Sequence, residues 1–289
     1  MNLFRRSWRV QIGTLDVSAL DVKFKVKRTL YARPGTCELD VFNLTAEHSA
    51  EISNLPRRST FVEVQAGYVE GRSVIFRGDL HKAVPVREGP NWIVRVNAGD
   101  GTHAIRTARV SRSFAAGTPL HQAAQHLADA MGVGIGNART ALEGAAFADG
   151  SGTFPEGTAL YGSAATELSR LTDAAGLTWS IQHGQLLVLP LGGALERTAI
   201  RIAPDSGMLD APEIVDRRTI TVKALLQPGL VPGQRIAVDS GVVSGVWRIS
   251  EVEYSGDTGP GGNDWTATMT CHRPLAPLVT GPATTPAVP

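Results

Sequence analysis

The feature of this sequence that most restricts its fold is a strict alternation of apolar and polar residues close to the N-terminus. Segment 21–29, DVKFKVKRT, carries an apolar set and a set of lysines at alternate positions: Val22, Phe24, Val26 and Lys23, Lys25, Lys27. A period of two places the two sets on opposite faces of a β-strand. The segment therefore predicts a half-buried strand whose exposed face carries three lysines.

A second alternating segment follows the turn sequence YARPG. In segment 36–43, TCELDVFN, apolar residues alternate with Glu38 and Asp40. If the two segments form a hairpin, the acids lie beside the lysines on one face, and each such cross-strand pair contributes about 0.2–1 kcal/mol to stability. A paired, solvated face is the simplest interpretation of the lysines. Whether they face a channel is left open.

The remainder of residues 1–112 also predicts strands. Segment 45–53 is the exception, because it predicts a short helix with Thr45 as its N-cap. Segment 61–80, FVEVQAGYVEGRSVIFRGDL, is typical of two strands joined by a Glu-Gly-Arg turn, and a further strand is predicted at 91–99. Five or six strands closed on themselves would form a small β-barrel without unpaired edges.

The next region, residues 113–195, changes to helical periodicity. Segment 118–132, TPLHQAAQHLADAMG, is amphipathic. Thr118 is the expected N-cap, Pro119 stands at the first helical position, and Gly132 ends the helix.

Two more elements complete this middle region. Segment 162–176 predicts a second helix with Ser163 as its cap. Segment 177–191, LTWSIQHGQLLVLPL, predicts a hairpin that turns at His183 and Gly184. Two helices followed by a hairpin indicate an α+β insertion between two β regions.

Residues 196–273 return to strand patterns. Strand segments are predicted at four places: 217–226, 229–239, 246–254 and 264–271. They indicate a second barrel similar in size to the first. Residues 274–289 are rich in Pro and Thr and predict an extended tail that is poorly ordered on its own. The predicted fold class is therefore mainly β, with two similar small β-barrel domains, residues 1–112 and 196–273, flanking the α+β region 113–195.

The composition excludes several classes of function. A formal net charge of +1 provides no broad field to attract nucleic acid or an anionic membrane. Two cysteines, Cys37 and Cys271, are too few for a disulfide-built domain and indicate reduced thiols. The start of the chain lacks the apolar run of a signal peptide, and the most apolar stretch, 186–195, is too short to span a membrane. We expect a soluble protein without stable membrane association.

The sequence offers no convincing cofactor or metal motif. Segment 132–144, GVGIGNARTALEG, superficially resembles a dinucleotide-binding loop, but it follows a predicted helix instead of a strand and its glycine spacing differs. His121 and His126 lie five residues apart, whereas metal-binding pairs on a helix prefer a spacing of four. We predict neither a cofactor nor a metal site.

Catalytic motifs are equally hard to find. No Gly-x-Ser-x-Gly nucleophile elbow occurs. All five tryptophans lie in strand patterns: Trp8, Trp92, Trp179, Trp247 and Trp265. Core packing or a subunit interface explains them more simply than stacking on single-stranded nucleic acid. The sequence thus predicts a protein that is not an enzyme.

Four longer motifs follow one another in a distinctive order. They are VFNLTAEHSAEI, VEVQAGYVEGRSVIFRGDL, DGTHAIRTARVSRSFAAGTPLHQAAQHLA and RISEVEYSGDTGPGGNDWTATMTC. This order resembles that of the hub proteins of phage tails and contractile injection systems, a family with phage baseplate hubs, the late control protein D group and the N-terminal half of valine-glycine-repeat spike proteins. The resemblance covers residues 7–273, nearly the whole chain.

The resemblance implies a homotrimer in which each subunit supplies two β-barrels to a pseudo-six-fold ring between a tail tube and a central spike. It implies a structural protein of the virion tail or baseplate, assembled in the host cytoplasm. The implied partners are the tail tube or distal tail protein, a separate spike protein and the tape-measure protein, while DNA only passes through the lumen. Candidate subunit-interface or lumen positions are Lys23, Lys25, Lys27, Glu63, Arg77, Trp247 and Trp265.

Two alternative functions stay open beside the structural hub. A tail-associated glycan hydrolase would need convergent carboxylates, for which Glu143, Asp149 and Glu156 are the candidates in the middle region. A carbohydrate-binding or adhesin module would need exposed tryptophans in a groove. Function has to be argued from such sites, because a fold alone does not decide among the three.

Overall fold

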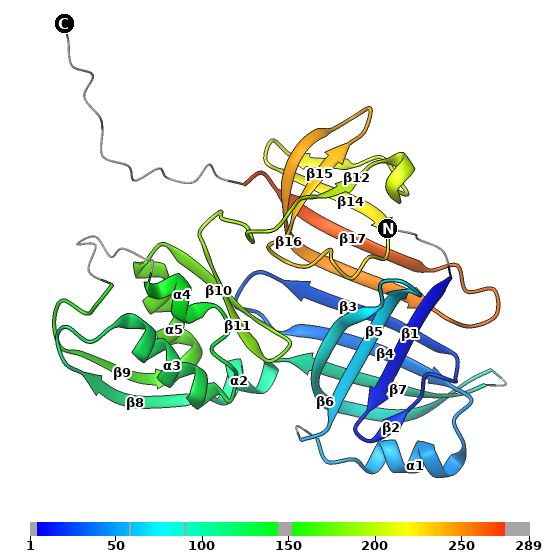
Figure 1. Cartoon of the computed structure of the whole chain (residues 1–289). Helices are drawn as coiled ribbons and strands as arrows, with labels where there is room; N and C mark the ends of the chain where they lie inside the picture. Colours follow the sequence, from blue (N-terminus) through cyan, green and yellow to red (C-terminus); the bar gives the residue numbers. More distant parts are fainter. Residues whose placement is uncertain (1–4, 58, 90, 144–151, 275–289) are drawn as a thin grey trace, which may run out of the picture.

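The computed structural model describes residues 5–57, 59–89, 91–143 and 152–274 (Figure 1). The protein is mainly β, as predicted. Most strands form one large sheet, and a smaller body of helices and two separate strand pairs lies at one side of it.

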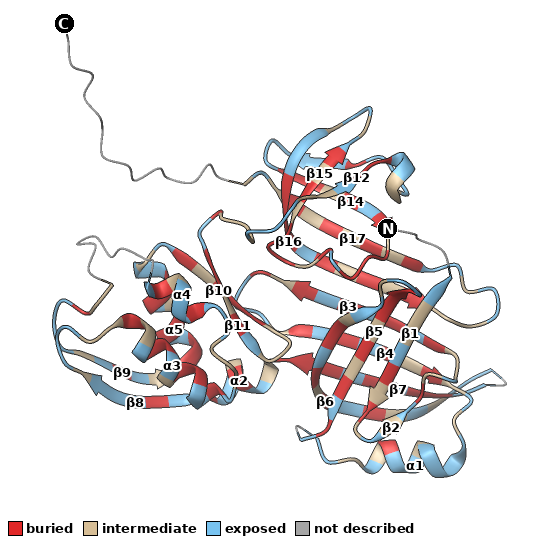
Figure 2. Ribbon diagram, viewed as in Figure 1, coloured by how far each residue is buried: buried red, intermediate tan, exposed pale blue. Residues whose placement is uncertain are grey.

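The first region contains most of the expected hairpins. Its elements are β1 (Arg6–Ile12), β2 (Leu15–Asp16), β3 (Val22–Thr29), β4 (Gly35–Phe42), α1 (Ala46–Asn54), β5 (Phe61–Tyr68), β6 (Ser73–Glu88) and β7 (Asn91–Asp100). β3 and β4 form the predicted pair, with Lys25 opposite Glu38. Buried and exposed residues alternate along both strands (Figure 2). Thr45 caps α1 by accepting a hydrogen bond from the N–H of His48, as predicted.

β6 is longer than the sequence predicted, because it continues beyond Leu80 to Glu88. A register shift between Leu80 and Lys82 marks a bulge against β7, and bulges bend and twist a strand. Residues 73–79 of β6 pair with β5, and β6 pairs with β7 from Asp79 onward, on both sides of the bulge. In Figure 1, β1 and β5 cross in front of β4 and β7, so the sheet folds back over its own core.

The middle region is the predicted mixture of helices and short hairpins. Its elements are α2 (Thr102–Thr107), β8 (Arg109–Phe114), α3 (Leu120–Met131), α4 (Ala138–Glu143), β9 (Thr158–Ser163), α5 (Ala164–Ala174), β10 (Leu177–Gln182) and β11 (Gln185–Pro190). Ser163 caps α5 as predicted. Thr118 does not cap α3, because the helix begins one residue later than expected and Pro119 itself occupies the N-cap position.

The turn between β10 and β11 follows the prediction. His183 and Gly184 have φ values of 54° and 74°. Two consecutive positive φ values are typical of the two-residue turns that match the twist of a β-hairpin. The hairpin therefore turns at His183 and Gly184, as the sequence predicted.

The second β region contains β12 (Ile200–Ile202), β13 (Glu213–Asp216), β14 (Thr219–Leu225), β15 (Arg235–Asp239), β16 (Ser244–Asp257), β17 (Trp265–His272) and a short 3-10 turn at Pro204–Ser206. β16 is the long strand of this region. Its register shifts between Ile249 and Glu251 against β17. Counted back from the last residue of the strand, this bulge lies at the same place as the one in β6.

The prediction of two closed barrels needs correction. Within the described residues, both β regions belong to one 13-stranded sheet, and no sheet closes into a barrel. The second edge of β3 pairs with β16, with Val26 opposite Tyr254. This edge is therefore not available to pair with another strand of the first region and close that region into a barrel. The two regions are therefore continuous through their backbones.

The hydrophobic residues form two clusters in the described part of the chain. One cluster contains residues of both β regions, and the other contains α2 to α5 with β10 and β11. The division of the chain at residues 112, 195 and 273 stays a prediction, and residue 112 lies inside β8, which pairs with β9. The predicted Pro-rich tail, 274–289, lies outside the described residues except for its first residue.

Candidate assembly surfaces

The two β regions repeat the same strand order. In the first, the order is β3-β4-β7-β6-β5; in the second, it is β13-β14-β17-β16-β15. Each order follows the chain in the same way, and the longest strand of each set carries the bulge. We call these five-stranded sets the first unit and the second unit.

The registers define which residues of the two units are equivalent. Counting from the bulges, Trp92 in β7 lies opposite Arg87, and Trp265 in β17 lies opposite Gly256 at the equivalent place. The Trp92 carbonyl accepts a hydrogen bond from the Asn43 N–H at 3.1 Å, and the Trp265 carbonyl accepts one from the Leu226 N–H at 3.0 Å. The two tryptophans therefore occupy equivalent positions.

Their environments differ. Trp265 is 1% exposed, whereas Trp92 is 59% exposed. Trp265 packs edge-on against Phe24 of β3, with ring centroids 5.6 Å apart, and against Trp8 of β1 at 6.2 Å. The Arg6 guanidinium lies 5.5 Å from the Trp265 ring. The junction between the two units thus covers Trp265.

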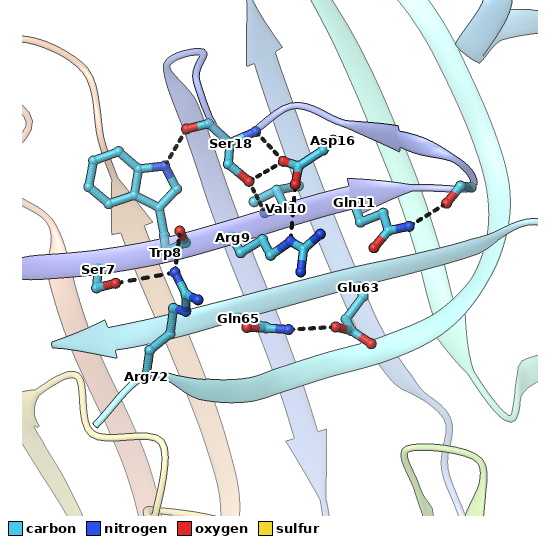
Figure 3. Close-up of polar contacts among 11 residues, drawn as sticks. Ser7, Trp8, Arg9, Val10, Gln11, Asp16, Ser18, Glu63, Gln65 and Arg72 are labelled. Carbon is cyan, nitrogen blue, oxygen red and sulfur yellow. Dashed lines mark hydrogen bonds and ion pairs between the residues drawn. The ribbon is translucent and has the colours of Figure 1, made fainter. Parts of the chain in front are cut away.

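Polar contacts hold β1 in place at this junction. Trp8 donates its indole N–H to the carbonyl of Ser18 at 3.2 Å, and Arg72 reaches the hydroxyl of Ser7 at 3.4 Å (Figure 3). Asp16 accepts hydrogen bonds from the hydroxyl and the N–H of Ser18, which lower the pKa of its carboxyl group. These contacts fix Trp8 where it meets Trp265.

The predicted lysine face exists, but its strongest partner is on another strand. Glu253 of β16 binds Lys25 at 2.8 Å and Lys27 at 2.9 Å. Burial opposes ionisation of Glu253, yet the hydrogen bonds from the two lysines outweigh it and lower the pKa of this carboxyl group. The predicted acid Asp40 instead binds Arg95 of β7 at 2.9 Å. A groove of about 500 Å³ on this face includes Lys23.

The other predicted positions are divided between surface and core. Glu63 and Arg77 are opposite each other on β5 and β6, with Arg77 Nε 3.9 Å from Glu63 Oε2, and Glu63 also accepts a hydrogen bond from Gln65 at 2.8 Å (Figure 3). Trp247 is 3% exposed, and Trp265 is as buried. The two tryptophans therefore offer little surface to a second subunit, and an interface or lumen role for the predicted set stays a prediction.

Two surfaces that the sequence did not single out lie at the free edges of the units. The part of β6 after the bulge pairs with β7 on one side only, and β13 pairs with β14 on one side only, among the described strands. Every residue of β13 is exposed. A mainly apolar groove of about 360 Å³ beside β6 is lined by residues such as Leu44, Ala50, Pro85 and Trp92.

The middle region is attached to the first unit through its β10–β11 hairpin. Gln182 accepts hydrogen bonds from Arg28 at 2.8 and 3.0 Å, and Asp100 accepts the backbone N–H groups of His183 and Gly184. Burial, with the charges of Arg28 and Arg77, lowers the pKa of His183 to about 3. This histidine is therefore neutral at physiological pH.

The residues considered for chemistry do not form a recognisable centre. Glu143 lies 3.3 Å from Arg139 and 3.7 Å from His121, Glu156 is exposed elsewhere, and Asp149 lies outside the described residues. In the part of the chain that the structure covers, no three His, Cys, Asp or Glu side chains could hold a metal together. No helix there is long and apolar enough to cross a membrane.

The glycines of segment 132–144 have a structural explanation. A Cβ on Gly136 would lie 1.9 Å from the carbonyl oxygen of Leu186 in β11, and the φ of Gly136 is 53°. Gly134 approaches Gln185 of the same strand. The loop is glycine-rich because its backbone lies directly against β11.

Comparison with known proteins gives one family. The model of the family described as baseplate hub gp41 matches residues 9–255 of this chain. No curated protein matches the sequence significantly.

Solved structures of similar fold come from phage tails and a secretion system. The 43 kDa tail protein of prophage MuSo2 from Shewanella oneidensis is 12% identical, with a TM-score of 0.67 over 93% of this chain and 97% of that one. A tail protein from Neisseria meningitidis MC58 is 10% identical, with a TM-score of 0.62 and the same coverage, 93% and 97%.

The third similar structure is the c3393 protein of E. coli, a component of the type VI secretion system with structural similarity to the T4 bacteriophage tail proteins gp27 and gp5. It is 10% identical, with a TM-score of 0.51 over 95% of this chain and 78% of that one. At such identities the three structures establish the fold alone.

Proposed function

The chain belongs to the baseplate hub gp41 family, and from this premise we propose that it is the structural hub of a phage tail or contractile injection baseplate. In this proposal three copies form a ring that connects a tail tube to a central spike. The hub acts by assembly and not by catalysis. The fold shared with phage tail proteins supports the proposal.

The observation that carries this proposal is the repeated strand order of the two units. Three copies of a chain with two equivalent units present six units around a three-fold axis. Such a ring matches a six-fold tube on one side and a three-fold spike on the other. The units act as open wall segments in place of closed barrels, and we assign the ring to residues 1–112 and 196–273, with 113–195 attached to it.

We assign the polar face of β3, β4, β7 and β16 to the lumen of the ring. Its charges are largely paired with one another, as Lys25 and Lys27 are with Glu253 and as Arg95 is with Asp40. A face with balanced charge attracts a polyanion weakly, because the attraction depends on unpaired cations. DNA and the tape-measure protein can then pass without being retained.

The partners follow from the position of such a hub. The ring would contact the tail tube or distal tail protein above it and a separate spike protein below it. The hub would be part of the virion tail or baseplate and would assemble in the host cytoplasm. Its ring contacts would come from strand edges. An unpaired edge promotes aggregation of a monomer, whereas in a closed ring it pairs with the neighbouring subunit.

Native mass spectrometry of the full-length chain, alone and with its spike protein, tests the proposal. We expect a species of three chains, and electron-microscopy averages that show six similar wall segments. A chain that stays monomeric at every concentration and in the presence of the spike would contradict the hub function.

A further inference from the structure

The chain contains one complete junction between units. Residues 251–257 of β16 pair with β3, with Tyr254 opposite Val26 and Ser255 opposite Lys25. Next to this strand pair, Trp265 is covered by aromatic side chains of β1 and β3 and by Arg6. The junction therefore combines a backbone ladder with a buried tryptophan.

The first unit has the same features without a partner. Counting from the bulges, residues 82–88 of β6 are equivalent to residues 251–257 of β16. Their outer edge is free among the described strands. Trp92, the equivalent of Trp265, lines the apolar groove beside this edge. The Arg87 guanidinium lies 5.8 Å from its ring, much as Arg6 lies against Trp265.

The second unit supplies the missing partner strand. β13 is equivalent to β3, because it pairs with β14 as β3 pairs with β4. Its outer edge is free, and Ile214 and Val215 are 57% and 59% exposed. Exposed β-branched residues on an unpaired edge strand are a template for pairing with another chain.

We propose that β13 of one copy of this chain pairs with residues 82–88 of β6 in a second copy and covers the Trp92 groove, which repeats between chains the β3–β16 junction found within the chain. The inference rests on the proposed ring and assigns the contact that closes it. Each copy offers β13 at one end and the groove at the other, so the contact is head-to-tail and can close into a ring.

The intrachain register fixes the register between copies. Val26 corresponds to Ile214 and Lys25 to Glu213, since they face equivalent residues of β4 and β14. Tyr254 corresponds to Pro85, and Ser255 to Val86, by their distance from the bulges. Ile214 therefore lies opposite Pro85, and Glu213 lies opposite Val86, in the neighbouring copy.

Pro85 makes this edge selective. The Asp257 N–H donates to Asp264 next to β17, so by strand alternation the backbone groups of Tyr254 point to β3 and those of Pro85 point to the free edge. Proline has no N–H to donate there, and proline on an edge strand discourages indiscriminate pairing. The contact therefore depends on side chains that fill the Trp92 groove as well as on the ladder.

Disulfide trapping in the full-length chain tests the register. In the double variant Glu213→Cys and Val86→Cys, the new thiols face each other across the contact, and non-hydrogen-bonded antiparallel pairs have Cα atoms about 4.5 Å apart, within disulfide range. The native Cys37 and Cys271 are buried and do not compete. We expect oxidation to give covalently linked dimers and trimers in denaturing gels.

The matched control is Glu213→Cys with Lys82→Cys, which lies on the same face of β6 but four residues away along the strand. It should give no specific linkage. Trp92→Ala provides a second measurement, because loss of a central tryptophan weakens an interface by about thirtyfold. It should shift the chain toward monomer at equal concentration without lowering its unfolding temperature substantially.

The outcomes separate this inference from the hub function. Linkage in the first variant but not in the control supports the contact. A trimer by native mass that neither links through Val86 nor responds to Trp92→Ala overturns the contact and leaves the hub function standing. A chain that never associates overturns both.

Discussion

Trp92 and Trp265 occupy equivalent positions in two strands of the same order, yet 59% of Trp92 is exposed and 1% of Trp265 is. Both rings lie near an arginine, Arg87 and Arg6 respectively. The difference arises because Trp265 meets Trp8 and Phe24 across the junction between the units. The exposure of the two tryptophans therefore distinguishes the covered edge of the second unit, beside Trp265, from the uncovered edge of the first unit, beside Trp92.

This contrast predicts different effects on stability. Trp265→Ala should lower the free energy of unfolding by about 3–5 kcal/mol, since it leaves a cavity between the units. Trp92→Ala should cost less than about 1 kcal/mol in the monomer, because more than half of Trp92 is already exposed to solvent. Urea unfolding of dilute protein measures both values, and equal losses would show that the two sites are not packed as described.

The approach of segment 132–144 to β11 gives a second prediction. Gly136→Ala places a methyl group against the carbonyl oxygen of Leu186, and it should destabilise the chain by more than about 3 kcal/mol. Gly132 has a similar φ of 67° but has no atom within 4 Å of its Cβ position, so Gly132→Ala should cost only about 1–2 kcal/mol. Thermal unfolding of both variants is the comparison, and equal costs would contradict the close approach.

His183 should make stability depend on pH. Its pKa is about 3 in the folded chain and about 6.5 in an unfolded one. Above pH 6.5 both states are neutral and the full stability is present. As the pH falls toward 3, only the unfolded state binds the proton, so stability falls by about 1.4 kcal/mol per pH unit.

The variant His183→Asn isolates this contribution. Asparagine tolerates the positive φ of the turn and does not titrate, so the loss of stability between pH 7 and pH 4 should be shallower in the variant. Urea midpoints measured across this range decide the matter. The same slope in both proteins would mean that His183 is protonated in the folded chain.

Glu253 should keep the affinity of the proposed lumen for DNA low. Glu253→Gln removes the partner of Lys25 and Lys27, so affinity for duplex DNA should rise several-fold at about 50 mM salt and fall steeply as salt increases. Glu51→Gln removes the same charge from α1, away from the polar face, and is the control. Fluorescence anisotropy with labelled duplex gives both affinities, and equal gains would argue against this face as the lumen.

The sequence was sufficient for local structure. Alternation predicted β3 and β4 and the faces of their side chains, Thr45 predicted the start of α1, and the pair His183-Gly184 predicted the turn between β10 and β11. These features are determined by residues that are close together in the chain, so the local sequence pattern predicts them. The sequence did not predict that Glu253 binds Lys25 and Lys27. Alternation identifies the exposed face of β3, but it does not show that β16 is the strand at the second edge of β3.

The pairing of strands that are far apart in the chain could not be predicted from the sequence. Nothing near Val26 or Tyr254 indicates that their strands are neighbours, so two separate barrels were expected where one continuous sheet exists. The assembly surfaces were missed for the same reason. Trp92 and Trp265 look alike in sequence, since they are the second residue of β7 and the first residue of β17, and only the packing of β1 and β3 makes one of them buried.

The pairing of β3 with β16 also orders events during synthesis. β3 leaves the ribosome long before its partner β16, because residues 30–243 lie between the two strands. Its second edge must stay unpaired while these intervening residues are made, and unpaired strand edges invite aggregation. A nascent chain stalled before β16 would therefore be the form most in need of a chaperone, and truncation there should yield insoluble protein.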